Sequence, residues 1–133
     1  VTTHHFLFED VETAVVNADR DKIAQVMHNL ISNAVKYSPP ETTIIVSTAL
    51  VSGNVKVSVK DQGMGINSED LPRIFDRYYR VENNITTSVS GFGIGLYLCS
   101  EIVHRHHGEI WVDSELGKGS VFSFAIPSLV QPS

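Results

Sequence analysis

An amphipathic helix with an unusual polar face occupies part of the first third of this chain, and it requires a second layer to pack against. Asp19 is a typical helix N-cap. The apolar residues that follow recur at the 3.6-residue spacing of a helix: Ile23, Val26, Met27, Leu30, Ile31, Ala34 and Val35. The prolines of SPPET, residues 38–42, end the helix because proline cannot continue it. An apolar stripe of this kind has to be buried against another element.

Strand signals elsewhere in the chain supply that second layer. Segments 42–51 and 54–61 predict a hairpin that turns at Ser52 and Gly53, and the valines of the second segment alternate with polar residues. Further strands are predicted at 4–9, 13–17, 109–114 and 120–127, and further helices at 68–75, with Ser68 as the cap, and at 93–107. The order of these elements predicts a two-layer α/β sandwich, an α+β arrangement with helices on one face of a mixed sheet.

The composition narrows the class of function. With 42% apolar and 19% charged residues, the chain has the make-up of an ordinary globular domain. Its net charge of −5 argues against nucleic acid as the main partner, because duplex binding usually needs a basic face. One cysteine cannot form an internal disulfide, which favours a reducing compartment. No apolar run approaches the ~20 residues of a membrane helix, and the start at Val1 suggests a piece cut from a longer protein.

The helix carries a polar stripe beside its apolar one. Gln25, Asn29, Asn33 and Lys36 fall in one contiguous sector at 100° per residue. A solvated face is the ordinary interpretation, but asparagine suits it poorly because several other polar residues are better helix formers. Two amide oxygens one turn apart, with an amine near them, indicate ligands for a hard cation and a positive charge for phosphate oxygens.

Two glycine-rich segments point to the same chemistry. In DQGMGI, residues 61–66, Asp61 stands at the end of a strand, where its carboxylate can accept from an exocyclic amine and favours adenine over guanine. In SGFGIGLYL, residues 90–98, three glycines lead into a helix whose N-terminus attracts phosphate. Taken alone, the first segment fits a simple hairpin turn better than a binding site, and the second is not the dinucleotide fingerprint.

Four motifs in order resemble the catalytic, ATP-binding domain of two-component sensor histidine kinases. They are N-x-x-x-N-A-x-K-Y, D-x-G-x-G-I, F-x-x-Y-Y-R and G-x-G-x-G-L, and the resemblance runs from about Asp19 to Pro127. This family shares the Bergerat fold with gyrase, the mismatch-repair ATPases and the ninety-kilodalton chaperones. The resemblance implies a mostly antiparallel sheet of about five strands, about three helices on one face and a flexible ATP lid at about 76–92. The whole chain, 1–133, would then be one domain of a longer sensor protein.

The resemblance also implies a role for individual residues. Asn33 would hold Mg²⁺ with support from Asn29, Lys36 would reach phosphate, and Tyr37 would pack on adenine. Asp61 would accept from the adenine amino group. The remaining pocket and lid positions implied by the family are Gly63, Gly65, Ile66, Phe75, Arg77, Arg80, Gly91, Gly93, Gly95, Leu96 and Ser120. Arg77 and Arg80 are the candidates for phosphate contact, and Ser120 stands where the family commonly has threonine near the base.

Other reactive residues are interpreted as structural. His104, His106 and His107, with Glu109, could suggest zinc. On a helical wheel, however, His106 falls in the apolar arc and His104 points elsewhere, so a satisfied or solvated histidine is favoured. Cys99 falls in an apolar arc and is expected to be a buried, inert thiol. His4 and His5 lack the acidic neighbour of the family's phosphoacceptor histidine.

Three functions remain open at this stage. The first is phosphoryl transfer from Mg-ATP to a histidine on a separate dimerisation domain of the same protein, which would then serve a response regulator in the cytoplasm, with the parent protein either soluble or membrane-anchored. The second is a hydrolase of the gyrase and chaperone kind, and the third is a docking module that binds nucleotide without catalysis. Position 29 argues against the hydrolase: those relatives carry a glutamate there, whereas Asn29 cannot accept a proton near neutral pH.

Overall fold

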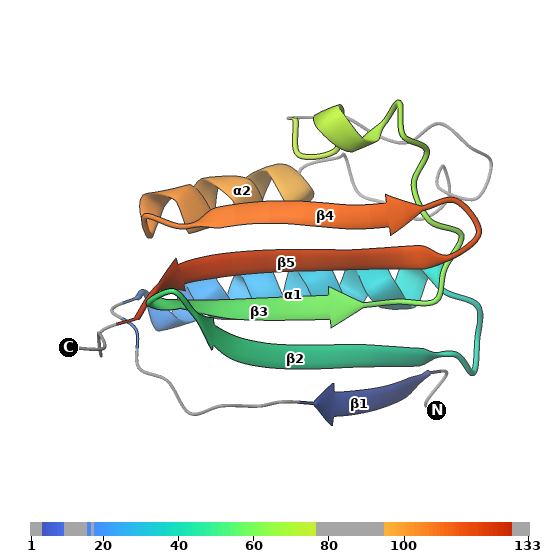
Figure 1. Ribbon diagram of the computed structural model, residues 1–133, viewed down its shortest axis with the longest axis horizontal. Helices are drawn as coiled ribbons and strands as arrows, with labels where there is room; N and C mark the ends of the chain where they lie inside the picture. The colour runs from blue at the N-terminus through green and yellow to red at the C-terminus, as the bar shows by residue number, and fades with distance from the viewer. Residues whose placement is uncertain (1–3, 10–15, 17, 77–94, 129–133) are drawn as a thin grey trace.

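The computed structural model describes residues 4–9, 16, 18–76 and 95–128, and these form one sheet with helices on one of its faces (Figure 1). The sheet has the strand order β1-β2-β3-β5-β4. Its strands are β1 (His5–Glu9), β2 (Thr43–Val51), β3 (Asn54–Lys60), β4 (Glu109–Glu115) and β5 (Gly119–Pro127). Among the strands of the described residues, only β1 and β2 pair in parallel, so the predicted mixed and mostly antiparallel sheet is confirmed.

The β2–β3 hairpin turns where the sequence predicts it. Val51 pairs with Asn54, which leaves Ser52 and Gly53 as the two loop residues. Both have positive φ, 51° and 82°, as a type I′ turn requires. That turn matches the right-handed twist of the strands, and it fixes the register that sends Val57 and Val59 to the buried face.

Helix α1 (Arg20–Tyr37) is capped as predicted, because the side chain of Asp19 accepts from the amides of Asp21 and Lys22. Helix α2 (Gly95–Arg105) ends earlier than the predicted His107. There the amide of Gly108 donates to the carbonyl of Val103, and the amide of His107 donates to the carbonyl of His104. This pair of bonds is a Schellman motif with His107 in the left-handed conformation, φ 64°.

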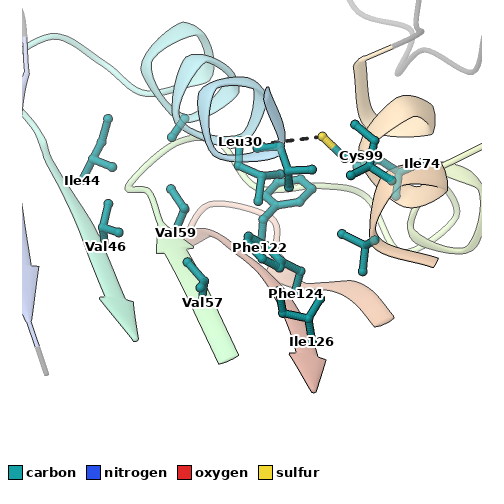
Figure 2. Packing of buried hydrophobic residues seen from close by; sticks show 14 residues of the cluster. Leu30, Ile44, Val46, Val57, Val59, Ile74, Cys99, Phe122, Phe124 and Ile126 are labelled. Carbon is teal, nitrogen blue, oxygen red and sulfur yellow. Dashed lines mark hydrogen bonds between the residues drawn. The ribbon is translucent and has the colours of Figure 1, made fainter. Parts of the chain in front are cut away.

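The core lies between the two helices and the sheet (Figure 2). Leu30 of α1 and Val103 of α2 are fully buried, as are Ile44, Val59 and Phe124 of the sheet. The thiol of Cys99 points from α2 towards α1 and donates to the carbonyl of Val26 at 3.9 Å. Cys99 is thus the buried thiol that the sequence predicts, and burial raises its pKa to about 11.

Edge strand β1 is less well covered than the rest of the sheet. Phe6, Leu7 and Phe8 are all exposed, Phe8 to 63%.

Among the described residues, neither α-helix combines the length and the apolar character needed to cross a membrane.

Two predicted elements differ in the structure. Segment 68–75 contains only a 3₁₀ turn, Leu71–Arg73, and its cap position is Asp70 without a side-chain bond, so the helix capped by Ser68 is wrong. Instead, the side chain of Asn67 accepts from the amide of Glu69. A segment this short cannot offset the cost of helix nucleation, and i to i+3 bonds suffice for its turns. The described residues therefore hold two α-helices and one 3₁₀ turn.

The predicted strand at 13–17 lies outside the described residues except for Val16, which has no regular structure. The strand that does pair with the hairpin on this side is β1, whose His5 lies opposite Thr43 of β2.

Candidate functional site

Three segments that are far apart in the sequence meet at one end of the molecule (Figure 1): the C-terminal end of α1, the end of β3 and the turn between β4 and β5. Backbone hydrogen bonds hold the last two together. The amide of Asp61 donates to the carbonyl of Ser120 at 2.9 Å, and the amide of Gly117 donates to the carbonyl of Met64 at 2.8 Å. The loop after β3 is therefore fastened to the β4–β5 turn at both of its ends.

Asp61 is a buried carboxylate with one oxygen committed to the backbone. Its Oδ1 accepts from the amides of Gly63 at 2.9 Å and Ser120 at 3.1 Å. Burial raises the pKa of Asp61 above its ordinary value, and the two backbone hydrogen bonds oppose that rise. Among the described residues no donor is paired with Oδ2. This arrangement fixes the carboxylate plane and leaves Oδ2 to accept from a ligand.

Glycines let the backbone approach this carboxylate closely. A Cβ at Gly63 would overlap the carbonyl oxygen of Tyr37, the last residue of α1. Gly65 has φ +77°, and a Cβ there would overlap the carbonyl of Glu115. The loop lies so close to α1 and to the β4–β5 turn that neither position can accept a side chain.

Ser114 joins the same segments and was not among the residues that the sequence singles out. Its Oγ accepts from the amide of Ile66 at 2.8 Å, donates to the carbonyl of Gly119 at 3.0 Å, and lies 2.8 Å from the Oγ of Ser120. One signal was available. Ser114 follows Ile110 and Val112 at alternate positions of β4, where the pattern of the buried face would favour a third apolar residue.

The polar face of α1 leads towards this site. Asn29, Asn33 and Tyr37 are half-buried and Lys36 is exposed. The contact between Gly63 and the Tyr37 carbonyl sets the end of this face beside Asp61. Asn29 also borders α2, because its side chain forms a hydrogen bond that partly offsets the rise in the pKa of the Cys99 thiol.

The fit of a divalent cation rests on the chemistry of this donor set. Asn29 and Asn33 are one turn apart on α1 and offer neutral amide oxygens, which suit Mg²⁺ when phosphate oxygens and water complete its shell. Among the described residues, no three His, Cys, Asp or Glu side chains are grouped to hold a metal on their own. The asparagines therefore fit a cation that arrives with a phosphate ligand.

The predicted lid and part of the predicted phosphate-binding segment lie outside the described residues. This applies to four predicted site residues, Arg77, Arg80, Gly91 and Gly93, and to the predicted lid from residue 77 onward. Gly95 is the first residue of α2 and is exposed, while Leu96 packs against the core. Phe75, before the lid, meets the ring of Phe122 edge-on at 6.2 Å between centroids.

Two histidines, His4 and His106, form structural hydrogen bonds. The Nε2 of His106 accepts from the amide of Asp19 at 2.9 Å, and its Nδ1 donates to the carbonyl of Ile102 at 2.8 Å. This neutral tautomer links the end of α2 to the start of α1, so His106 is the satisfied histidine that the sequence favours. His4 is buried and donates from Nε2 to the carbonyl of Ser38 at 3.0 Å.

A cavity of about 380 Å³ adjoins the end of the β4–β5 hairpin. Besides Asp61, Ser114 and Ser120, its lining includes Lys60 and Val121, which alternate with Asp61 and Ser120 along their strands. Lys60 and Val121 therefore belong to the face of the sheet that is turned away from the helices. We take the candidate nucleotide site to be on the opposite face, where Asp61 and Ser120 project.

Comparison with known proteins gives consistent matches. Residues 18–130 match the family described as histidine kinase-, DNA gyrase B- and HSP90-like ATPase. The chain is 43% identical over 114 residues to the sensor histidine kinase WalK of Bacillus subtilis, which covers 84% of this chain and 19% of that protein. It is 44% identical over 111 residues to the adaptive-response sensory kinase SasA of Synechococcus elongatus, covering 83% and 28%. The chain thus spans less than a third of the length of these relatives.

Solved structures give the same picture. A mycobacterial sensor histidine kinase, MprB, superposes with a TM-score of 0.82 at 25% identity, covering 98% of this chain and 84% of that one. The catalytic domain of the histidine kinase ThkA superposes with a TM-score of 0.79 at 32% identity, covering 93% and 80%.

Proposed function

Because the chain belongs to the histidine kinase-, gyrase- and HSP90-like ATPase family, as a catalytic domain of the sensor histidine kinase type, we propose that it transfers the γ-phosphate of Mg-ATP to a histidine on a separate dimerisation domain. In this proposal the base binds at Asp61 and the phosphates lie along the polar face of α1. The whole chain is one such domain of a longer sensor, acting in the cytoplasm with a response regulator downstream.

The observation that carries the proposal is the amide at position 29. Asn29 is half-buried on the face of α1 that also bears Asn33, and its side chain hydrogen-bonds towards α2. An amide can orient a ligand but cannot remove a proton from water near neutral pH. A site of this kind can stabilise a phosphoryl group in transit, yet it needs an acceptor from elsewhere.

The predicted site residues fall into two groups, one for each end of ATP. Asp61 and Ser120, with Gly63, Gly65 and Ile66 shaping the loop, would recognise adenine, and Tyr37 would pack on its ring. Asn33 would hold Mg²⁺ with Asn29 in support, and the bound cation would neutralise charge on the phosphates. Lys36, Arg77 and Arg80 would contact phosphate oxygens. Gly91, Gly93 and Gly95 would form the phosphate cradle and the far hinge of a lid over about 76–92, and Leu96 would line the nucleotide site beside them.

The test is transfer of labelled γ-phosphate from ATP. The chain is incubated alone and then mixed with its native upstream dimerisation helices, and both samples are analysed for labelled protein and released phosphate. We expect label on a histidine of the helices, in the mixture only, because this chain supplies position and charge but no nucleophile.

Two other results would overturn the proposal in different directions. Rapid release of phosphate by the isolated chain would favour a hydrolase, with some group other than Asn29 activating water. Tight ATP binding with no transfer in either sample would favour a docking module that uses the nucleotide only to set its conformation.

A further inference from the structure

Ser114 is a hub of hydrogen bonds beneath the candidate base site. It is half-buried on β4, and three of its neighbours lie within hydrogen-bonding distance of its Oγ: the amide of Ile66 at 2.8 Å, the carbonyl of Gly119 at 3.0 Å and the Oγ of Ser120 at 2.8 Å. A serine hydroxyl has one proton to donate and two lone pairs that accept. All three capacities of this hydroxyl are therefore in use.

The direction of each bond follows from what the partners can do. The amide of Ile66 can only donate and the carbonyl of Gly119 can only accept, so the Ser114 proton goes to Gly119. The remaining lone pair of Ser114 then receives the proton of Ser120. Consequently the Ser120 hydroxyl has donated its only proton to Ser114, and towards a ligand it can act only as an acceptor.

That polarity matters because Ser120 is next to the buried carboxylate. The amide of Ser120 donates to Oδ1 of Asp61 at 3.1 Å, and both side chains project from the same face of neighbouring strands. Oδ2 of Asp61 has no donor among the described residues. The pair thus presents two acceptors side by side, which suit a base with an amino group and disfavour one with a carbonyl at the same place.

We propose that Ser114 is a specificity-determining positioning residue: by taking the proton of Ser120 it keeps that hydroxyl an acceptor and so biases the site towards a 6-amino purine over a 6-oxo purine. This inference rests on the proposed function, since it assumes that ATP binds at Asp61. Ser114 acts through Ser120 and touches no substrate itself.

The experiment compares ATP with inosine triphosphate, which differs at the 6-position and carries a carbonyl there. The dissociation constant of each is measured by calorimetry with Mg²⁺ for the wild-type chain and for Ser114→Ala. Without Ser114, the Ser120 hydroxyl can turn its proton towards a 6-oxo group. The ratio of the inosine triphosphate to the ATP dissociation constant should therefore fall by about tenfold, the equivalent of one hydrogen bond.

Matched variants separate selectivity from general damage. Ser114→Thr keeps the hydroxyl and should keep the wild-type ratio. Ser58→Ala breaks a similar serine pair, Ser58 with Ser123 at 2.9 Å, on the same sheet but away from Asp61, and should also leave the ratio unchanged. If Ser114→Ala does not fold, Ser114→Cys preserves the volume with a poorer hydrogen-bonding group and should lower the ratio in the same direction.

Each result has a distinct meaning. A wild-type chain that does not bind ATP would refute the proposed function itself. Normal ATP binding by the wild-type chain, with a ratio that stays the same in Ser114→Ala, would refute only the role of Ser114. That includes the case in which both nucleotides weaken equally, as expected if Ser114 merely supports the loop.

Discussion

Replacing Asp61 with asparagine should abolish most of the affinity for ATP, because the hydrogen bonds of the carboxylate fix how the new amide is oriented. In the wild-type chain Oδ1 accepts from the amides of Gly63 and Ser120. In Asp61→Asn the amide oxygen has to take the place of Oδ1, because an amino group there would face two donors. The new amino group therefore occupies the place of Oδ2 and meets the amino group of adenine donor to donor.

The size of the effect follows from two contributions. Loss of a hydrogen bond to a charged acceptor costs about 1.5–3 kcal/mol, and leaving buried donors unpaired adds about 1–3 kcal/mol. Asp61 is only 5% exposed, so water does little to relieve either cost. A total of roughly 2.5–6 kcal/mol corresponds to a rise in the dissociation constant of roughly 10²- to 10⁴-fold.

Calorimetric titration with Mg-ATP would measure this rise. Asp113→Asn provides a matched control, since it makes the same change on an exposed position of β4 and should leave the affinity unaltered. Thermal unfolding would verify that Asp61→Asn is folded. Affinity within a few fold of the wild-type value, in a folded variant, would refute the assignment of Asp61 to the base site.

Three further predictions concern the metal, pH and the end of α2. Asn33→Ala should remove most of the effect of Mg²⁺ on ATP affinity, an effect of about tenfold or more, while adenosine binding stays nearly unchanged. Titrations with and without a chelator would measure this. A full magnesium effect in the variant would contradict it. Burial raises the folded pKa of Asp61 above its unfolded value, so the contribution of Asp61 to stability falls as pH rises through that folded pKa. The unfolding free energy of Asp61→Asn relative to wild type should therefore increase with pH over this range. A constant or decreasing difference in denaturant titrations would contradict this. His107→Gly should stabilise the fold by about 1 kcal/mol, because φ is 64° there; an unchanged or lower melting temperature would refute this.

The local rules of the sequence were sufficient for α1 and for the β2–β3 hairpin. Asp19 caps α1 through bonds to its own first turn, and Ser52 with Gly53 fixes the hairpin through its own backbone conformation. Both features depend only on neighbours in the chain. Segment 68–75 failed for the converse reason: its pattern fits a helix, but Asn67 competes for the first free amides and the segment is too short to nucleate one.

The site divides along the same line. The place of Asp61 in the fold could be predicted, because a carboxylate at the end of a strand and before two glycines is conspicuous in the sequence. The role of Ser114 could not be predicted, because its bonds to Ile66 and Ser120 join different elements. Ile66 lies 48 residues away from Ser114 in the sequence. The binding roles of Asp61, Asn29, Asn33 and Lys36 stay predictions.

The segments around Asp61, where we propose that the base binds, are held by contacts that leave little room for adjustment. Gly63 lies against the carbonyl of Tyr37, and Gly119 lies against the carbonyl of Asp61, so a methyl group at either position would overlap the backbone. Oδ1 of Asp61 is also fixed by two amides. A site whose acceptors are ordered before the ligand arrives avoids the entropic cost of ordering them on binding. We therefore expect contacts to the base to contribute a large share of the binding free energy of ATP. Lys36, by contrast, is exposed, so its side chain has more conformational freedom than these buried groups.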